Sequence, residues 1–243
     1  MPAAIDAPAR LADFICVGAQ KAGTSWLYRQ LLGHPSIYMR TKETNFFMQQ
    51  RPAAQYAAFF AEARADQLTG DISPNYMGRT EIAGRIHALC PQARLIMLLR
   101  DPVARAHSQW KMSRALGNMP LETTLLEAFA DDLNRLRTRG EYAAILKGYL
   151  RLFELGKQLA VFWYDDIRDR PERLIRRVAC HIGLKSAISW PYLQEVVYPS
   201  PRSDSLDAAA AKVLQAYYAP HDAELRAVLN VPLLPWERRA TSL

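Results

Sequence analysis

The chain has 243 residues, half of them hydrophobic and 23% charged, a balance typical of a folded globular protein that excludes an intrinsically disordered one. It carries 31 Lys and Arg against 24 Asp and Glu, giving a net charge of +7 and a pI near 9.4. This excess favours anionic partners. It is not gathered into a basic block or a recognisable nucleic-acid-binding module, so we expect no nucleic-acid partner.

The length suits one domain with a full hydrophobic core, which we expect over residues 11–243 after a flexible N-terminal arm at 1–10. No run of about 18 apolar residues is present, and Asp6, Arg10 and Asp13 interrupt the N-terminus. We therefore expect no membrane span, no signal peptide and a cytoplasmic location. The three cysteines and five histidines are scattered, so we expect buried free thiols and no metal site.

The first structured stretch, Phe14 to Leu32, has the order strand, glycine-bounded loop and helix. Four apolar β-forming residues precede Gly18, Gly23 closes the loop, and apolar residues then recur at helical spacing from Trp26. Such a loop gathers backbone N–H groups at a helix N-terminus, where the helix dipole favours an anion. Lys21 adds a positive charge inside the loop. The pattern therefore predicts a phosphate-binding loop, with an ordinary strand-to-helix turn as the alternative.

The spacing of the two glycines is that of a Walker A loop, G-x-x-x-x-G-K-[ST], but the lysine is elsewhere. Thr24 follows the second glycine and Lys21 precedes it, which argues against an ordinary NTPase. GAQKAGTSWL instead resembles the 5′-phosphosulfate-binding loop of sulfotransferases that use 3′-phosphoadenosine 5′-phosphosulfate (PAPS), most of all the Golgi heparan-sulfate type and its bacterial relatives. The resemblance implies PAPS contacts from the loop residues: Gln20, Lys21, Ala22, Gly23, Thr24, Ser25 and Trp26.

A second stretch, Tyr38 to Phe47, places Lys42 and Glu43 between a short β-type piece and two phenylalanines. Taken alone, a Lys-Glu pair is most often a solvated ion pair, because such residues are rarely buried. A carboxylate against aromatic surface also suits a general base. In the family that the loop resembles, a K-E-x-x-F-F motif stands here and its glutamate is taken to be the general base. Residues 42–47 match that motif, which implies this role for Glu43.

A strand beginning at Leu68 leads into Asp71-Ile72-Ser73-Pro74-Asn75-Tyr76, which resembles the T-P-x-Y turn of the family. Many heparan-sulfate enzymes carry a functional lysine directly before that turn, where this chain has Ile72. We therefore expect an acceptor site that differs from theirs, and the residue that replaces the lysine stays open. Asp71 is a candidate second carboxylate on the acceptor side.

Strands and helices alternate along the rest of the chain. A helix over 79–89 precedes a continuous apolar strand over 93–99, and another buried strand is expected over 159–164. This alternation predicts an α/β fold, a P-loop-like three-layer sandwich with a central parallel sheet flanked by helices. Residues 111–140 are polar, and we expect a helical lid or acceptor-side insertion there. Further helices are predicted over 55–65, 121–139, 140–155 and 206–218.

The segment from Arg100 to Trp110 follows the strand at the edge where open α/β sheets bind ligands. A guanidinium suits a phosphate, and a serine one or two helical turns later adds a hydroxyl. The segment matches the family's 3′-phosphate motif, R-D-P-x-x-R-A-x-S-x-W, which implies that Arg100 and Ser108 hold the 3′-phosphate. We expect Asp101 to cap a helix and Arg105 to form a salt bridge.

Two later basic stretches have different expected roles. Related enzymes carry a basic loop near residues 198–204 that folds over the nucleotide, which implies that Arg202 contacts phosphate. The arginines between 168 and 177 resemble a nucleic-acid-binding stripe. The helical spacing of Glu172 and Arg176 favours a solvated face instead.

Taken together, the resemblance implies transfer of a sulfuryl group from PAPS to a hydroxyl, or secondarily an amine, of a carbohydrate or small-molecule acceptor. PAP, the 3′,5′-bisphosphate, would be the product, and no metal would be required. Lys21 and Glu43 are the expected catalytic residues. The alternatives are a P-loop kinase-like phosphotransferase and a non-catalytic nucleotide- or RNA-binding protein. The sequence sets neither the acceptor nor the oligomeric state.

Overall fold

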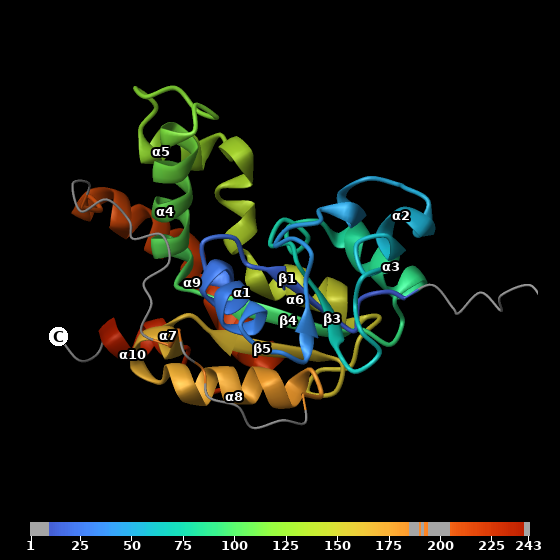
Figure 1. Ribbon diagram of the computed structural model, residues 1–243. Helices are drawn as coiled ribbons and strands as arrows, with labels where there is room; N and C mark the ends of the chain where they lie inside the picture. The colour runs from blue at the N-terminus through green and yellow to red at the C-terminus, as the bar shows by residue number, and fades with distance from the viewer. Residues whose placement is uncertain (1–9, 185–189, 191, 194–204, 241–243) are drawn as a thin grey trace, which may run out of the picture.

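A parallel five-stranded sheet forms the centre of the structure, a computed structural model that describes residues 10–184, 190, 192–193 and 205–240 (Figure 1). The strand order is β2-β3-β1-β4-β5, and every pairing is parallel. The strands are β1 (Phe14–Gly18), β2 (Ile37–Tyr38), β3 (Leu68–Ile72), β4 (Arg94–Leu99) and β5 (Leu159–Trp163). Because β1 is buried along its whole length between β3 and β4, the segments that follow these three strands share one edge of the sheet.

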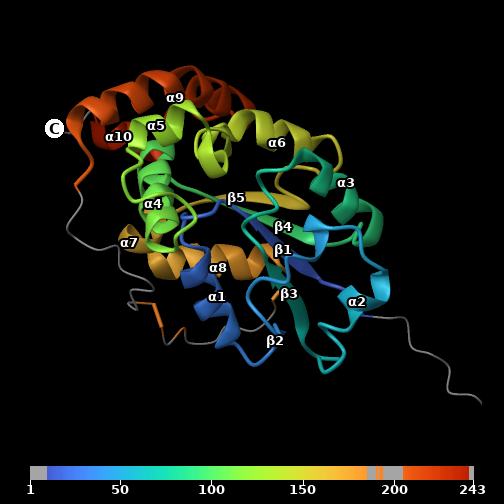
Figure 2. The same ribbon diagram turned by 90° about the horizontal axis from the view of Figure 1, so that it is seen from above.

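Helices cover both faces of the sheet, which confirms the predicted three-layer α/β sandwich (Figure 2). In this view α3, α6 and α9 lie on one side of the strands, and α1 and α8 lie on the other. The α-helices are α1 (Thr24–Leu32), α2 (Ala53–Ala57), α3 (Thr80–Leu89), α4 (Pro102–Ala115), α5 (Leu125–Ala130), α6 (Tyr142–Leu150), α7 (Asp165–Asp169), α8 (Pro171–His181), α9 (Ala208–Leu229) and α10 (Pro235–Ala240). Short 3-10 helices occupy Phe46–Met48, Leu133–Arg135 and Thr138–Gly140. In the described part of the chain, none of the helices is long and apolar enough to cross a membrane.

The predicted helix over 121–139 is wrong. Helix α5 ends at Ala130, and the backbone then turns through residues with positive φ, including Asp132 (51°) and Asn134 (54°). The Asp132 carboxylate accepts hydrogen bonds from the backbone N–H groups of Arg137 (2.7 Å) and Thr138 (3.0 Å). An aspartate that bonds the backbone in this way competes with helical hydrogen bonds, so the segment folds as two 3-10 turns.

Four other sequence expectations need correction. Helix α2 covers only Ala53–Ala57 of the region where 55–65 was expected, and α9 continues past 218 to Leu229 although Pro220 lies inside it. Strand β5 is at the edge of the sheet and only half-buried, because one side of it lacks a neighbouring strand. Arg105 is fully buried but forms no ion pair with a described residue. It donates instead to the Gln109 side chain (2.5 Å) and to a backbone carbonyl.

Two glycines test the packing described above. A Cβ at Gly70 in β3 would overlap the buried ring of Phe14, whereas a Cβ at Gly84 in α3 would meet no atom within 4 Å. We expect Gly70→Ala to lower the free energy of unfolding by about 1–3 kcal/mol through overpacking. The matched change Gly84→Ala should raise it by up to about 1 kcal/mol, since alanine favours a helix. Urea denaturation of the two variants measures both, and equal stabilities would contradict this packing.

Candidate functional site

The loop between β1 and α1 is shaped by two glycines at positive φ. At Gly18 (φ 144°) a Cβ would lie 2.8 Å from the backbone oxygen of Pro74 and 2.8 Å from the Met77 Cβ. At Gly23 (φ 90°) a Cβ would collide with the Cδ1 atom of Ile167. Neither position has room for a side chain, and both lie in a region of φ that favours glycine. The loop is therefore packed tightly against neighbouring segments and leads directly into α1, whose N-terminal N–H groups favour an anion.

Arg100 joins the end of β4 to this loop. Its Nη1 donates a hydrogen bond to the backbone oxygen of Lys21 at 3.0 Å. The guanidinium lies over the ring of Tyr164, with Cζ 4.4 Å from the ring centroid, and the backbone oxygen of Arg100 accepts from the Tyr142 hydroxyl at 2.8 Å. The two predicted phosphate-binding elements therefore lie on the same side of the sheet and in direct contact.

Lys21 is half-buried among other cations. Burial lowers the pKa of Lys21, and the positive charges of Arg100 and Lys42 lower it further. Its Nζ lies 3.6 Å from the Met112 sulfur in α4. An ammonium group held beside two like charges is stabilised by an anion among them.

The other predicted nucleotide contacts differ in exposure. Thr24 begins α1 and is buried, and the Trp26 indole is buried with its N–H directed at the backbone oxygen of Leu193 (3.4 Å). Asp101 caps α4 by accepting from the N–H of Val103 (2.9 Å), which confirms its predicted role. Ala22 and Ser108 are buried, Gln20 and Ser25 are partly exposed, and Arg202 lies outside the described residues, as do 1–9 of the predicted arm.

Glu43 and Lys42 form an ion pair at the same edge of the sheet. Lys42 Nζ lies 2.8 Å from Glu43 Oε1, and the two side chains are 26% and 31% exposed. The backbone oxygen of Lys42 accepts a hydrogen bond from the N–H of Ile72, the last residue of β3, at 3.1 Å. The ion pair is therefore partly exposed, and a substrate bound at this edge of the sheet could contact both side chains.

Asp71 is not on the acceptor side, as the sequence suggested, but inside the protein. It is fully buried, and burial raises its pKa against the opposing effect of hydroxyl donors. Four hydroxyl groups donate to its carboxylate, those of Thr44 (2.7 Å), Ser73 (2.6 Å), Tyr76 (2.9 Å) and Tyr56 (3.2 Å). Asp71 therefore cannot reach a substrate, and it organises the protein around Glu43 instead.

The same hydroxyls hold the backbone after Glu43. The N–H of Asn45 donates to the Ser73 hydroxyl (3.0 Å), and the N–H of Phe46 donates to the Thr44 hydroxyl (3.2 Å). The phenylalanines of the K-E-x-x-F-F motif complete the anchor, since Phe46 stacks on Tyr56 with ring centroids 4.6 Å apart. The motif thus fixes the position of Glu43 through a buried aromatic and hydroxyl cluster.

The segment 111–140, where a lid or insertion was expected, contacts the loop through Arg139, whose Nη1 donates to the Gln20 side chain. Burial and the charges of Arg105, Arg135 and Arg79 lower the pKa of Arg139 to about 10. Sequence reasoning missed this residue, because its segment carries no family motif. It also missed the contact of Tyr164 with Arg100, although Tyr164 is the last residue of the strand expected over 159–164.

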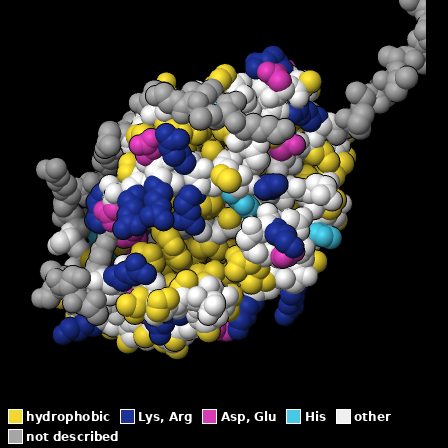
Figure 3. Space-filling view, turned by 90° about the horizontal axis from the view of Figure 1, so that it is seen from below, with side chains coloured by type: hydrophobic (Ala, Val, Ile, Leu, Met, Phe, Trp, Pro, Cys, Tyr) yellow, Lys and Arg dark blue, Asp and Glu magenta, His cyan; other side chains and the backbone are white. Residues whose placement is uncertain are grey.

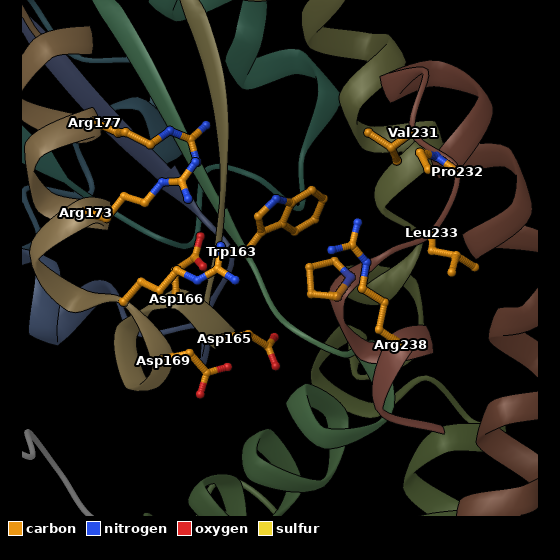
Figure 4. A pocket seen from close by; sticks show the side chains of 12 residues that line it. Trp163, Asp165, Asp166, Asp169, Arg173, Arg177, Val231, Pro232, Leu233 and Arg238 are labelled. Carbon is orange, nitrogen blue, oxygen red and sulfur yellow. The ribbon is translucent and has the colours of Figure 1, made fainter. Parts of the chain in front are cut away.

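A separate pocket of about 390 Å³ lies between α7, α8 and the segment that leads into α10 (Figure 4). It carries four arginines and three aspartates near Trp163, and none of the predicted nucleotide or catalytic residues lines it. Its lining residues are Trp163, Asp165, Asp166, Asp169, Arg170, Arg173, Arg177, Val231, Pro232, Leu233, Pro235 and Arg238.

The face of the molecule seen from below carries a gathering of basic side chains (Figure 3). Helix α8 contributes three exposed arginines, Arg173, Arg176 and Arg177. Arg176 pairs with Glu172 at 2.8 Å, as their helical spacing predicted. These exposures are those of a solvated helix face. Among the described residues, no group of three or more His, Cys, Asp or Glu is placed to hold a metal ion.

The sheet and its loop define an α/β protein with a glycine-bounded loop and two cations, Lys21 and Arg100, at the carboxyl ends of its strands, the edge where such sheets bind ligands. Residues 11–208 match the sulfotransferase domain family, so the chain belongs to the sulfotransferase family, as the sequence resemblance predicted. It is 31% identical over 189 residues to human heparan sulfate glucosamine 3-O-sulfotransferase 6, a match that covers 74% of this chain and 54% of that protein. Mouse heparan sulfate glucosamine 3-O-sulfotransferase 3B1 is 28% identical over 214 residues, covering 77% of this chain and 53% of the relative. The chain spans about half the length of these relatives.

Solved structures agree with this assignment. A sulfotransferase from Alicyclobacillus acidocaldarius superposes with a TM-score of 0.79 at 25% identity, covering 94% of this chain and 99% of that one. Mouse sulfotransferase SULT7A1 in complex with PAP shares the fold, with a TM-score of 0.53 at 17% identity over 74% of this chain and 61% of that one.

Removal of the Thr44 hydroxyl tests whether the buried hydroxyl cluster around Asp71 anchors the segment that carries Glu43. Thr44→Val keeps the shape of the side chain but leaves Asp71 one donor short, so we expect a loss of about 1–3 kcal/mol in the free energy of unfolding. Thr44→Ser keeps the hydroxyl and should retain most of the stability. Thermal unfolding measures both variants, and a Thr44→Val protein as stable as the parent would contradict the anchoring role.

Proposed function

We propose that the chain transfers a sulfuryl group from PAPS to an acceptor hydroxyl and releases PAP. The hydrogen bond from Arg100 to the Lys21 backbone carries this proposal, because it joins the predicted 3′-phosphate-binding residue to the predicted 5′-phosphosulfate-binding loop. A ligand with anionic groups at both ends of a ribose suits that pairing. Membership of the sulfotransferase family favours sulfuryl transfer over the phosphoryl transfer of a kinase.

In this proposal the loop holds the 5′ end of PAPS through backbone N–H groups at the start of α1, while Arg100 and Ser108 hold the 3′-phosphate. Lys21 stabilises the charge that develops on the leaving phosphate oxygen, since it lies inside the loop with a lowered pKa and cationic neighbours. Glu43 takes the proton of the acceptor hydroxyl as the new sulfur–oxygen bond forms. Most of the catalytic work is then positioning and charge stabilisation, as in phosphoryl transfer.

A carbohydrate is the acceptor class that we propose first. The two 3-O-sulfotransferase relatives are named for heparan sulfate glucosamine, which supports a sugar hydroxyl over an amine. The sequence resemblance implies that many heparan-sulfate enzymes carry a lysine where this chain has Ile72, so the acceptor need not be heparan sulfate itself. A screen with ³⁵S-labelled PAPS against heparan sulfate, simple glycosides and phenols identifies the acceptor.

Glu43→Gln tests the general base. The amide cannot take a proton, so turnover should fall by about 10²–10⁴-fold while PAP affinity stays nearly unchanged. Glu172→Gln is the control, because it removes an exposed carboxylate from a comparable ion pair. Labelled sulfate transfer and calorimetry with PAP measure the two effects. An undiminished rate for Glu43→Gln would remove Glu43 from this role.

Arg100→Ala tests the 3′-phosphate site. Loss of a charge-assisted hydrogen bond should weaken PAP binding by about 10–100-fold and abolish the preference for PAP over AMP, which lacks the 3′-phosphate. Arg176→Ala, an exposed arginine on α8, is the control. Calorimetry with both nucleotides provides the measurement. If the parent protein itself binds PAP and AMP equally well, the 3′-phosphate assignment is wrong.

A further inference from the structure

Three cations converge at the carboxyl edge of the sheet, and the reaction described above uses only two of them. Lys21 and Arg100 have assigned roles, whereas Lys42 has none. Its charge and that of Arg100 both lower the pKa of Lys21, and its Nζ lies 2.8 Å from the Oε1 atom of Glu43. Keeping like charges together is unfavourable unless an anion lies among them. Glu43 supplies one anion to Lys42, and an anionic ligand bound at this edge would supply a second.

The backbone contact of Lys42 explains how it reaches this edge. Ile72 is the last residue of β3, and its N–H donates to the Lys42 carbonyl at 3.1 Å. Strand β3 pairs with β1 through Ile72 and Cys16, two residues before Gly18 begins the loop. Lys42 therefore lies beside Ile72 at the carboxyl end of β3. The Ile72 side chain itself is completely buried and offers no charge.

The ammonium group of Lys42 has donors to spare. It carries three N–H groups, and Glu43 is its one hydrogen-bond or ion-pair partner within the described part of the chain. The side chain is about a quarter exposed, so the remaining donors are open to a ligand at the edge. Lys42 thus contacts the proposed base and keeps donors that a ligand at this edge can reach.

We propose that Lys42 is a third catalytic residue, which donates hydrogen bonds to the non-bridging oxygens of the sulfuryl group during transfer. This inference rests on the proposed function. The acceptor oxygen bonds to sulfur, and the bond from sulfur to the 5′-phosphate oxygen breaks with its electron pair going to PAP. The acceptor proton goes to Glu43, and Lys42 stays protonated throughout.

The test compares ligands with and without the sulfuryl group. Lys42→Met should lower the rate at which bound PAPS is converted to PAP by about 10²–10³-fold, the usual effect of removing one donor to a developing charge. The rate is measured with heparan sulfate as acceptor and with water alone. Affinity for PAP, which lacks the sulfuryl group, should stay within about twofold of the parent. Lys42→Arg should recover part of the rate, and Lys147→Met, an exposed lysine paired with Glu224, should leave it unchanged.

A double variant separates a direct role from one exerted through Glu43. If Lys42 contacts the sulfuryl group, Lys42→Met will slow the reaction further in a Glu43→Gln protein. The proposal is overturned if the double variant is no slower than Glu43→Gln alone, if Lys42→Met has the parent rate, or if it weakens PAP and PAPS binding equally. Circular dichroism verifies that each variant is folded. If Lys42→Met does not fold, the same comparisons are made with Lys42→Arg. A parent protein that neither binds PAP nor consumes PAPS would instead refute the proposed function.

Discussion

The hydrogen bond from the Arg100 guanidinium to the Lys21 carbonyl ties the end of β4 to the loop that follows β1. The two strands are neighbours in a parallel sheet, so their carboxyl ends meet without any long excursion of the chain. Tyr164 beneath the guanidinium and Tyr142 on the Arg100 carbonyl restrict the remaining freedom of this arginine. With its position fixed in this way, the Arg100 guanidinium holds the proposed 3′-phosphate site against the proposed 5′-phosphosulfate loop.

The proposed base is held by a different kind of chemistry. Asp71 collects four hydroxyl donors within the protein, and those hydroxyls in turn accept backbone N–H groups from the residues after Glu43. A buried carboxylate with all of its hydrogen bonds formed favours one arrangement of the neighbouring side chains. Losing any of these bonds would leave a buried polar group without a partner, which is costly in free energy. The buried cluster around Asp71 thus positions the loop that carries Lys42 and Glu43. The two charged side chains of that loop stay partly exposed.

Much of this arrangement could be predicted from the sequence, because the strands β1 and β4 are continuous apolar runs and the motifs directly follow them. The parallel sheet, the loop at Gly18 to Gly23 and the cap at Asp101 were predicted in this way. The role of Asp71 was not, since a carboxylate before a turn looks the same in sequence whether it faces solvent or four hydroxyl groups. The helix predicted over 121–139 was wrong, because the composition of this segment favours a helix and does not show that the Asp132 side chain bonds the backbone and ends it.

The close contact of Gly23 with Ile167 has an evolutionary consequence. The hydrogen atom of this glycine faces the isoleucine of α7 with no space for a methyl group, and Tyr164 closes the same side. A side chain at position 23 would have to push the end of the Ile167 side chain aside and accept a backbone at φ 90°, which favours glycine. Related sequences should therefore keep glycine at position 23, or carry a smaller residue at position 167 where they do not.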